Sequence, residues 1–271
     1  MRTEQFKHIA AASFRDFAHM MRNVTEHADS EVIHRLRVSY KQLRANFRMY
    51  FFVRGGPAFT MPAALKEIYT TAGELRNRQL LLAYFASTER STRRLLSVYL
   101  GKLRTDARRS NKKLCRLIAD TPLTGIRRKL LAAIDKPLPT SAFTGWLQAV
   151  NIKVKTSAGS RFISDTALHS IRKQLKDIHY NLKIYSVPLR RQLLTTIWKG
   201  KTAEGMESLL QALGNFQDLC SFIALLQTDQ PDTLSAAAQK AIGSLRNGFI
   251  AKKKKLKPGV RVQLSASLLP R

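Results

Sequence analysis

Apolar residues recur every three or four positions through most of the chain. This spacing places them on one face of a helix, so the pattern predicts helices rather than strands. Turn-forming residues such as Gly55, Gly56 and Pro57 interrupt the pattern at intervals, as they do between helices. The predicted helices lie near residues 4–22, 31–53, 62–86, 89–119, 124–135, 165–186, 189–199, 203–227 and 232–256. The sequence therefore predicts an all-α fold.

One segment near the middle of the chain interrupts the pattern for longer. Residues 136–164 are rich in Pro, Ser, Thr and Gly, which is typical of a connection between two folded parts. We therefore expect a single domain over residues 1–271, with a first half at about 1–135 and a second half at about 165–257. A basic tail at 252–271 ends the chain.

An internal repeat supports this division into halves. The segment 34–50 aligns without a gap with the segment 169–185, at a constant offset of about 135 residues. Apolar residues recur in both segments at alternating steps of three and four, which predicts one buried face on each helix. The aligned polar pairs are His34 with His169, Arg37 with Arg172, Lys41 with Lys176, Arg44 with His179, Arg48 with Lys183 and Tyr50 with Tyr185.

The charge of the chain is strongly unbalanced. Lysine and arginine number 47 against 18 acids, which gives a formal net charge of +29. Such an excess repels itself in any compact state, so we expect an anionic partner. Polyphosphate, nucleic acid and an acidic membrane surface all fit this composition, and composition alone does not rank them.

The aligned cations form one stripe on each repeat helix. At 3.6 residues per turn, each stripe covers roughly 80° of the helix and runs about 21 Å along it. We predict that these two rows flank a linear polyanion. Their members are His34, Arg37, Lys41, Arg44 and Arg48 in the first half and His169, Arg172, Lys176, His179 and Lys183 in the second.

A row of charges is often only a solvated helix face, and that alternative applies to each stripe taken alone. Two observations favour a functional interpretation. The stripes keep the same register in both halves, and residues 32–66 contain no acid that would form stabilising i,i+4 pairs.

A further basic group has a less specific spacing. It extends the anion track, contacts nucleic acid weakly, or serves only solubility, and the sequence leaves these alternatives open. The group consists of Arg104, Arg108, Arg109, Lys112, Lys113 and Arg116.

Sequence motifs of catalysis are missing. The chain has no GxxxxGK phosphate loop, no GxSxG elbow and no HExxH pair, so we predict binding without catalysis. The two stripe histidines lack partners at metal-ligand spacing, so we expect neither a metal nor a cofactor. Cys115 and Cys220 fit buried free thiols better than a disulfide. No apolar run approaches the length of a membrane span, so we expect a cytoplasmic protein.

These motifs resemble the CHAD family, the conserved-histidine α-helical domains. The resemblance rests on VIHRLRVSYKQLRANFR at 32–48, LHSIRKQLKDIHYNLK at 168–183 and LGNFQDL at 213–219. It implies two helical bundles related by an internal pseudo-twofold repeat, with a basic central cavity or pore. It also implies binding of inorganic polyphosphate and association with polyphosphate granules. The CYTH triphosphatase domain that is fused to some members does not fit this sequence.

The sequence departs from the family pattern in its first half. A second, weaker repeat aligns Leu75-Arg76-Asn77 with Leu213-Gly214-Asn215, and this alignment puts Leu80 where the family has an acid. Asp218 keeps that acid in the second half. The departure implies that the two halves bind unequally.

Nucleic-acid or general polyanion binding is the main alternative to polyphosphate binding, and a protein-interaction scaffold is the third. A nucleic-acid site would add exposed aromatic or base-reading groups to its cations. Tyr40 and Phe47 instead lie on the apolar seam, where we expect core residues. The sequence therefore favours polyphosphate, with weak nucleic-acid binding still open.

Overall fold

A computed structural model describes residues 1–56, 58–160, 163–197 and 203–268. Parts of several predicted features lie outside these residues: Pro57, positions 161–162 of the connection, 198–199 of one helix and 269–271 of the tail. Over the described ranges the secondary structure is entirely helical, which confirms the predicted all-α fold. The helices are α1 (Thr3–Glu26), α2 (Ser30–Val53), α3 (Ala63–Ala86), α4 (Arg90–Leu95), α5 (Ser97–Ala119), α6 (Leu123–Ala132), α7 (Thr140–Ala158), α8 (Asp165–Leu182), α9 (Val187–Ile197), α10 (Ala203–Thr228) and α11 (Ala236–Leu268).

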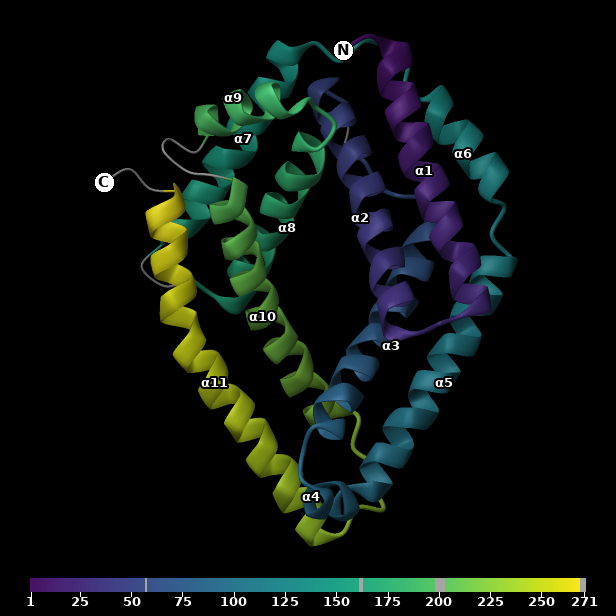
Figure 1. The fold of residues 1–271 in the computed structure, drawn as a ribbon, viewed down its shortest axis with the longest axis vertical. Helices are drawn as coiled ribbons and strands as arrows, with labels where there is room; N and C mark the ends of the chain where they lie inside the picture. The colour runs from purple at the N-terminus through teal and green to yellow at the C-terminus, as the bar shows by residue number, and fades with distance from the viewer. Residues whose placement is uncertain (57, 161–162, 198–202, 269–271) are drawn as a thin grey trace.

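The helices form an elongated assembly with two long helices along its outer edges. Figure 1 shows α5 on one edge and α11 on the other, with α2, α3, α8 and α10 between them. The helix α2 packs against α1, α3, α7 and α8, and α10 packs against α8, α11 and α3. The interior is therefore built from α2 and α8, the two helices on which the sequence places the cationic stripes.

Capping groups fix where these two helices begin. The Asp29 carboxylate accepts hydrogen bonds from the backbone amides of Glu31 and Val32, both at 2.8 Å, at the start of α2. The Ser164 hydroxyl accepts from the amide of Ala167 at 3.0 Å at the start of α8. Each cap satisfies amides that have no partner inside the helix, so the sequence sets where both stripe helices begin.

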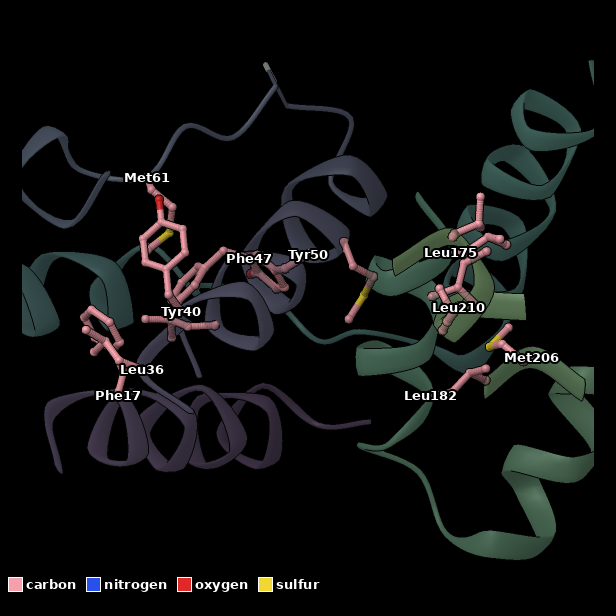
Figure 2. Packing of buried hydrophobic residues seen from close by; sticks show 14 of the residues in the cluster. Phe17, Leu36, Tyr40, Phe47, Tyr50, Met61, Leu175, Leu182, Met206 and Leu210 are labelled. Carbon is pink, nitrogen blue, oxygen red and sulfur yellow. The ribbon is translucent and has the colours of Figure 1, made fainter. Parts of the chain in front are cut away.

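The apolar seams of α2 and α8 lie in one large core. Phe17 of α1 contacts Tyr40 of α2 with ring centroids 5.9 Å apart, and Phe6 stacks on Tyr50 at 5.1 Å. Figure 2 shows the aromatic residues of α2 on one side and Leu175 and Leu210 of α8 and α10 on the other. A second, smaller core joins the far ends of α3, α5, α10 and α11. Core contacts thus run through both halves of the chain.

The region predicted as a connection is mostly a helix. Residues Thr140–Ala158 form α7, whose Phe143, Trp146 and Leu147 are buried. The predicted set of helices lacks this one, because the sequence analysis weighed Pro, Ser, Thr and Gly content above the apolar spacing inside the segment. Burial against α8, α2 and α11 stabilises a helix that local composition disfavours.

Two other boundaries differ from the sequence expectation. The predicted helix 89–119 is divided at Leu96 into α4 and α5. The predicted tail continues α11 as a helix to residue 268, with Pro258 inside it. Lys253 and Lys257 both pair with Asp165 at the start of α8, at 2.8 and 2.7 Å. These ion pairs hold the tail against the second half.

The helix α10 qualifies the expectation that the chain has no membrane span. By length and composition alone, Glu204–Thr228 is long and apolar enough to cross a bilayer. In this fold the helix packs against α3, α8 and α11. Both cysteines are free, as expected, but Cys115 and Cys220 are half-buried rather than buried.

Buried asparagines connect the helices at equivalent positions of the two halves. The Asn46 side-chain amide donates to the Ser13 hydroxyl of α1 at 3.0 Å. The Asn181 amide donates to the backbone carbonyl of Ala45 in α2 at 3.0 Å and to that of Asp177 at 2.9 Å. Asn181 therefore joins α8 to α2 through a fully buried hydrogen bond.

We expect Asn181→Ala to lower the free energy of unfolding by about 1–3 kcal/mol, because the carbonyl of Ala45 loses its buried donor. Urea denaturation followed by circular dichroism measures this loss. The exposed Asn247→Ala is the matched control and should stay within about 0.5 kcal/mol of the wild type. Equal effects of the two substitutions would show that the cross-helix hydrogen bond contributes nothing.

Candidate functional site: a cationic cluster between α2 and α8

The two stripe helices lie side by side, as Figure 1 shows. Besides the Asn181 hydrogen bond, Nη1 of Arg48 in α2 donates a hydrogen bond to Oδ2 of Asp177 in α8 at 3.3 Å. These contacts set the register of one helix against the other. As a result, cations of both rows repel one another across the interface.

Lys41 lies at the centre of this repulsion. Burial, followed by repulsion from Arg37, Arg172, Lys176 and Arg44, lowers the pKa of Lys41 to about 7. Burial and Arg172 also lower the pKa of Lys176. We call Arg37, Lys41, Arg44, Arg172 and Lys176 the central cluster. It combines three predicted site residues of α2 with two of α8.

Stacked tyrosines hold the arginines on the α2 side. Arg37 donates Nη1 to the backbone carbonyl of Tyr69 at 2.8 Å, and its guanidinium lies 4.4 Å from the centre of the Tyr69 ring. Tyr69 stacks on Tyr40 at 4.3 Å, and Arg44 lies 5.6 and 5.7 Å from these two rings. The ring faces attract the cations and limit their freedom. Tyr40 is buried, so its assignment to the core is confirmed.

Several polar atoms in this region have no hydrogen-bond partner among the described residues. They include the Nε atoms of Arg44 and Arg172 and the Nδ1 atom of His169. No ion pair within the described ranges involves a member of the central cluster. Buried polar groups ordinarily have partners, so donors left over in a cationic cluster favour an anionic ligand.

A family model of the CHAD domain matches residues 8–227 of the sequence. The chain belongs to the CHAD family. This match extends over both stripes and ends before α11. No curated protein matches the sequence.

Solved structures have the same fold. The CHAD domain from the plant Ricinus communis is similar with a TM-score of 0.74 and 19% identity, covering 100% of this chain and 94% of that one. PptA from Streptomyces chartreusis is similar with a TM-score of 0.64 and 16% identity, covering 97% of this chain and 98% of that one. At these identities the comparison shows a shared fold.

Two glycines of this CHAD domain bear on the second repeat alignment. A Cβ at Gly73 would overlap the Arg37 guanidinium, and a Cβ at Gly214 would lie 3.8 Å from Nη2 of Arg172. Because Arg37 and Arg172 are aligned, these contacts match Gly73 with Gly214. This match differs by three residues from the alignment of Leu75-Arg76-Asn77 with Leu213-Gly214-Asn215.

The register set by the two glycines changes which residue replaces the acid. It matches Asn77, and not Leu80, with Asp218. It also matches Arg76 with Gln217, and both lie beside the stripe histidines. Burial, followed by Arg76, lowers the pKa of His34, whereas Gln217 opposes the lowering of the His169 pKa by burial. The first half thus has an additional cation where the second half has an amide.

The sequence analysis did not assign Arg76 to the site, although it quoted the motif that contains it. Arg76 donates Nη1 to the carbonyl of Ser30 at 2.8 Å and also contacts the Ser30 hydroxyl. Burial lowers the pKa of Arg37, and Arg172 and Arg76 lower it further. Asp218 lies near Arg172, Arg76 and Lys41, but burial outweighs their attraction and raises its pKa. Arg76 and Asp218 therefore border the central cluster.

Three predicted site residues lie outside the central cluster, and each differs from its members in charge, pairing or exposure. Burial, with Lys183 and Lys176, lowers the pKa of His179 to about 4, so this residue is neutral at pH 7 although its counterpart Arg44 is charged. Arg48 is partly neutralised by Asp177. Lys183 is the exposed C-cap of α8. The two rows thus present unequal charge.

The predicted extension lies elsewhere. Its residues are exposed on α5, which packs against α3, α1 and α4. Arg109 pairs with Asp106 and Lys113 with Glu67, at 3.2 and 3.1 Å. Two surface pockets lie along the second half of α11, and neither includes a residue of the central cluster. The central cavity or pore stays a prediction.

We expect Lys41→Met to raise the free energy of unfolding of the unliganded CHAD domain by about 1–2 kcal/mol at pH 7. Each unit by which the pKa is lowered represents about 1.4 kcal/mol of unfavourable charging, and lost packing offsets part of the gain. Folding lowers the pKa of Lys41, so the destabilisation caused by its charge is largest below pH 7. This destabilisation disappears as the pH rises toward 10.5.

Urea denaturation at pH 6.5 and pH 9.5 measures this effect. Lys112→Met, an exposed position on α5, is the control and should change stability by less than about 0.5 kcal/mol at both values. A loss of stability in Lys41→Met at pH 6.5 would contradict the repulsion described here.

Proposed function

We propose that this protein binds inorganic polyphosphate through the central cluster and does not catalyse its turnover. The observation that carries the proposal is the group of cations around Lys41, drawn from two helices and without an ion pair among the described residues. A polyphosphate chain has a negative charge on every phosphoryl unit, so it relieves repulsion on both helices at once. The CHAD family membership supports this proposal.

The chemical groups of the cluster suit phosphate oxygens. Arginine offers a planar fork of donors that binds two oxygens together, and lysine offers a mobile point charge. Tyr69 already fixes Arg37 by a hydrogen bond and by stacking, so less side-chain entropy is lost when an anion binds. The cluster therefore combines fixed and mobile donors.

Nucleic acid fits this cluster less well. Single-stranded chains are held largely by bases that stack on aromatic side chains. Near the cluster, Tyr40 is buried and Tyr69 stacks against it. Their ring faces are occupied by each other and by arginines, which favours an anion without bases. We further propose that the protein works in the cytoplasm, in association with polyphosphate granules.

A competition titration tests the ligand class. Labelled long-chain polyphosphate is displaced by unlabelled polyphosphate, single-stranded RNA or duplex DNA at matched phosphate concentration and near-physiological salt. We expect displacement by polyphosphate at concentrations at least roughly tenfold lower than by either nucleic acid, a difference of about 1.4 kcal/mol. Equal or better displacement by nucleic acid would identify a general polyanion binder.

Substitutions in the same assay test the site. The pair Lys41→Met and Arg172→Met should weaken polyphosphate binding by roughly tenfold or more, because both charges lie in the cluster. Lys254→Met with Lys255→Met removes the same charge from the exposed surface of α11 and should change affinity by about twofold or less. Equal losses from the two pairs would mean that net charge alone drives binding.

Binding should also take up protons. An anion beside Lys41 raises its pKa from about 7 toward or above its ordinary value of 10.5. Between these values the bound state holds more protons, so affinity should fall as the pH rises from 7 to 10. Lys176 adds to this uptake because its pKa is also lowered, whereas the stripe histidines act at lower pH.

Calorimetric titration at pH 8 in buffers with different ionisation enthalpies counts the protons taken up. Lys41→Arg keeps the positive charge at this pH and should take up fewer protons than the wild type, while it still binds. Identical proton uptake by both proteins would rule out Lys41 as the titrating group.

A further inference from the structure

The outer face of α5 has a charge pattern that the central cluster does not use. Its six cations between residues 104 and 116 are all exposed and point over roughly 180° of the helix, along about 18 Å. The stripe on α2 is narrower and partly buried. The exposed face of α5 is therefore broad and convex, and we call it the α5 face. Its members are Arg104, Arg108, Arg109, Lys112, Lys113 and Arg116.

The spacing within the α5 face is unfavourable for an isolated helix. Arg104, Arg108, Lys112 and Arg116 follow one another at steps of four, which places each cation beside the next. Like charges at this spacing destabilise a helix, whereas alternating acids and bases stabilise it. A face that served only solubility would not require this repetition.

Acidic residues form ion pairs with only some of the cations of the α5 face. Asp106 pairs with Arg109 at 3.2 Å and with Lys102 at 2.5 Å. Glu67 of α3 pairs with Lys113 at 3.1 Å. The structure gives no ion pair to the four cations spaced by four, and all four belong to the described part of the chain. These four are available to an anionic partner.

The α5 face is also separate from the central cluster. The buried side of α5, with Leu103, Ala107 and Leu114, packs into the cores beneath it. In Figure 1 this helix forms an outer edge, and its neighbours are α3, α1 and α4 rather than α8. A ligand on the α5 face therefore does not need to touch Lys41 or Arg172.

We propose that the α5 face binds the phosphate backbone of double-stranded nucleic acid without sequence preference. One strand of a duplex has a charge about every 3.4 Å along the axis, so roughly five phosphates fall within the length of the face. The wide angular spread of the cations suits a rigid, broad surface whose phosphates lie in two rows. A single flexible polymer would contact only part of it at a time.

The apolar residues of α5 between Arg104 and Arg116 argue against an anionic membrane as the partner of the α5 face. A helix that lies on a bilayer inserts large apolar side chains into the interface. Between Arg104 and Arg116 the large apolar side chain is Leu114, and it is fully buried in the protein core. The α5 face thus offers cations without an apolar anchor.

Binding to short duplex DNA and duplex RNA, measured by fluorescence anisotropy over a range of salt concentrations, tests the proposal. One variant replaces the four unpaired cations by glutamine: Arg104→Gln, Arg108→Gln, Lys112→Gln and Arg116→Gln. A control of the same net charge replaces four exposed lysines of α11 on the opposite edge: Lys240→Gln, Lys252→Gln, Lys254→Gln and Lys255→Gln.

We expect the α5 variant to lose at least roughly tenfold in affinity for a duplex of either kind. Its slope of log affinity against log salt should become shallower by about three to four, since each lost phosphate contact removes about 0.9. The α11 control should keep the wild-type slope. Loss with only one kind of duplex would assign the face to DNA or to RNA.

Two results would overturn the proposal. One is equal loss in the α5 variant and the α11 control, which would reduce binding to net charge. The other is unchanged duplex binding in the α5 variant together with lost binding to vesicles that contain anionic lipid, which would assign the face to membranes.

The polyphosphate affinity of the α5 variant is measured in parallel and should equal that of the wild type. The α5 face and the central cluster are different sites, so either proposal can fail without the other. A circular dichroism melt of each variant checks that it is folded.

Discussion

The main constraint on this structure is that it must hold like charges close together between α2 and α8. Burial, together with repulsion from four other cations of these helices, lowers the pKa of Lys41 to about 7. Their repulsion opposes the packing of the two helices, so the interface must supply enough favourable contacts to keep them in register. The same repulsion among cations therefore affects both the candidate site and the stability of the fold.

The contacts that offset this cost lie beside the cluster rather than within it. The buried Asn181 amide and the Arg48–Asp177 ion pair connect α8 to α2. Tyr69 and the small Gly73 let the Arg37 guanidinium lie flat against α3. These groups fix positions, while the cluster cations form no ion pair among the described residues. In the proposed function, an anion bound at the cluster replaces this repulsion with attraction.

Positive charge has a different form in the interior and at the edges. Around Lys41 it is concentrated, partly buried and drawn from two helices, so its effect on pKa is large. On α5 it is spread over an exposed convex surface, where solvent and salt screen it. The net charge of +29 is therefore better understood as separate regions that differ in burial and screening than as one uniform property.

The sequence by itself determined the helical class, both stripe helices and most of their boundaries. Apolar spacing and capping residues act locally, and the 135-residue repeat predicted which cations correspond. The CHAD resemblance was also readable from local motifs, and the family match confirms it.

Only the tertiary structure decided which of these cations meet. It placed Arg76 at the border of the cluster, engaged Arg48 with Asp177, made His179 neutral and separated α5 from α2. It also brought Gly73 against Arg37 and Gly214 against Arg172, and it showed the helix α7 within the expected connection. These features depend on burial and on distances between helices far apart in the sequence, which residue spacing along one helix does not contain.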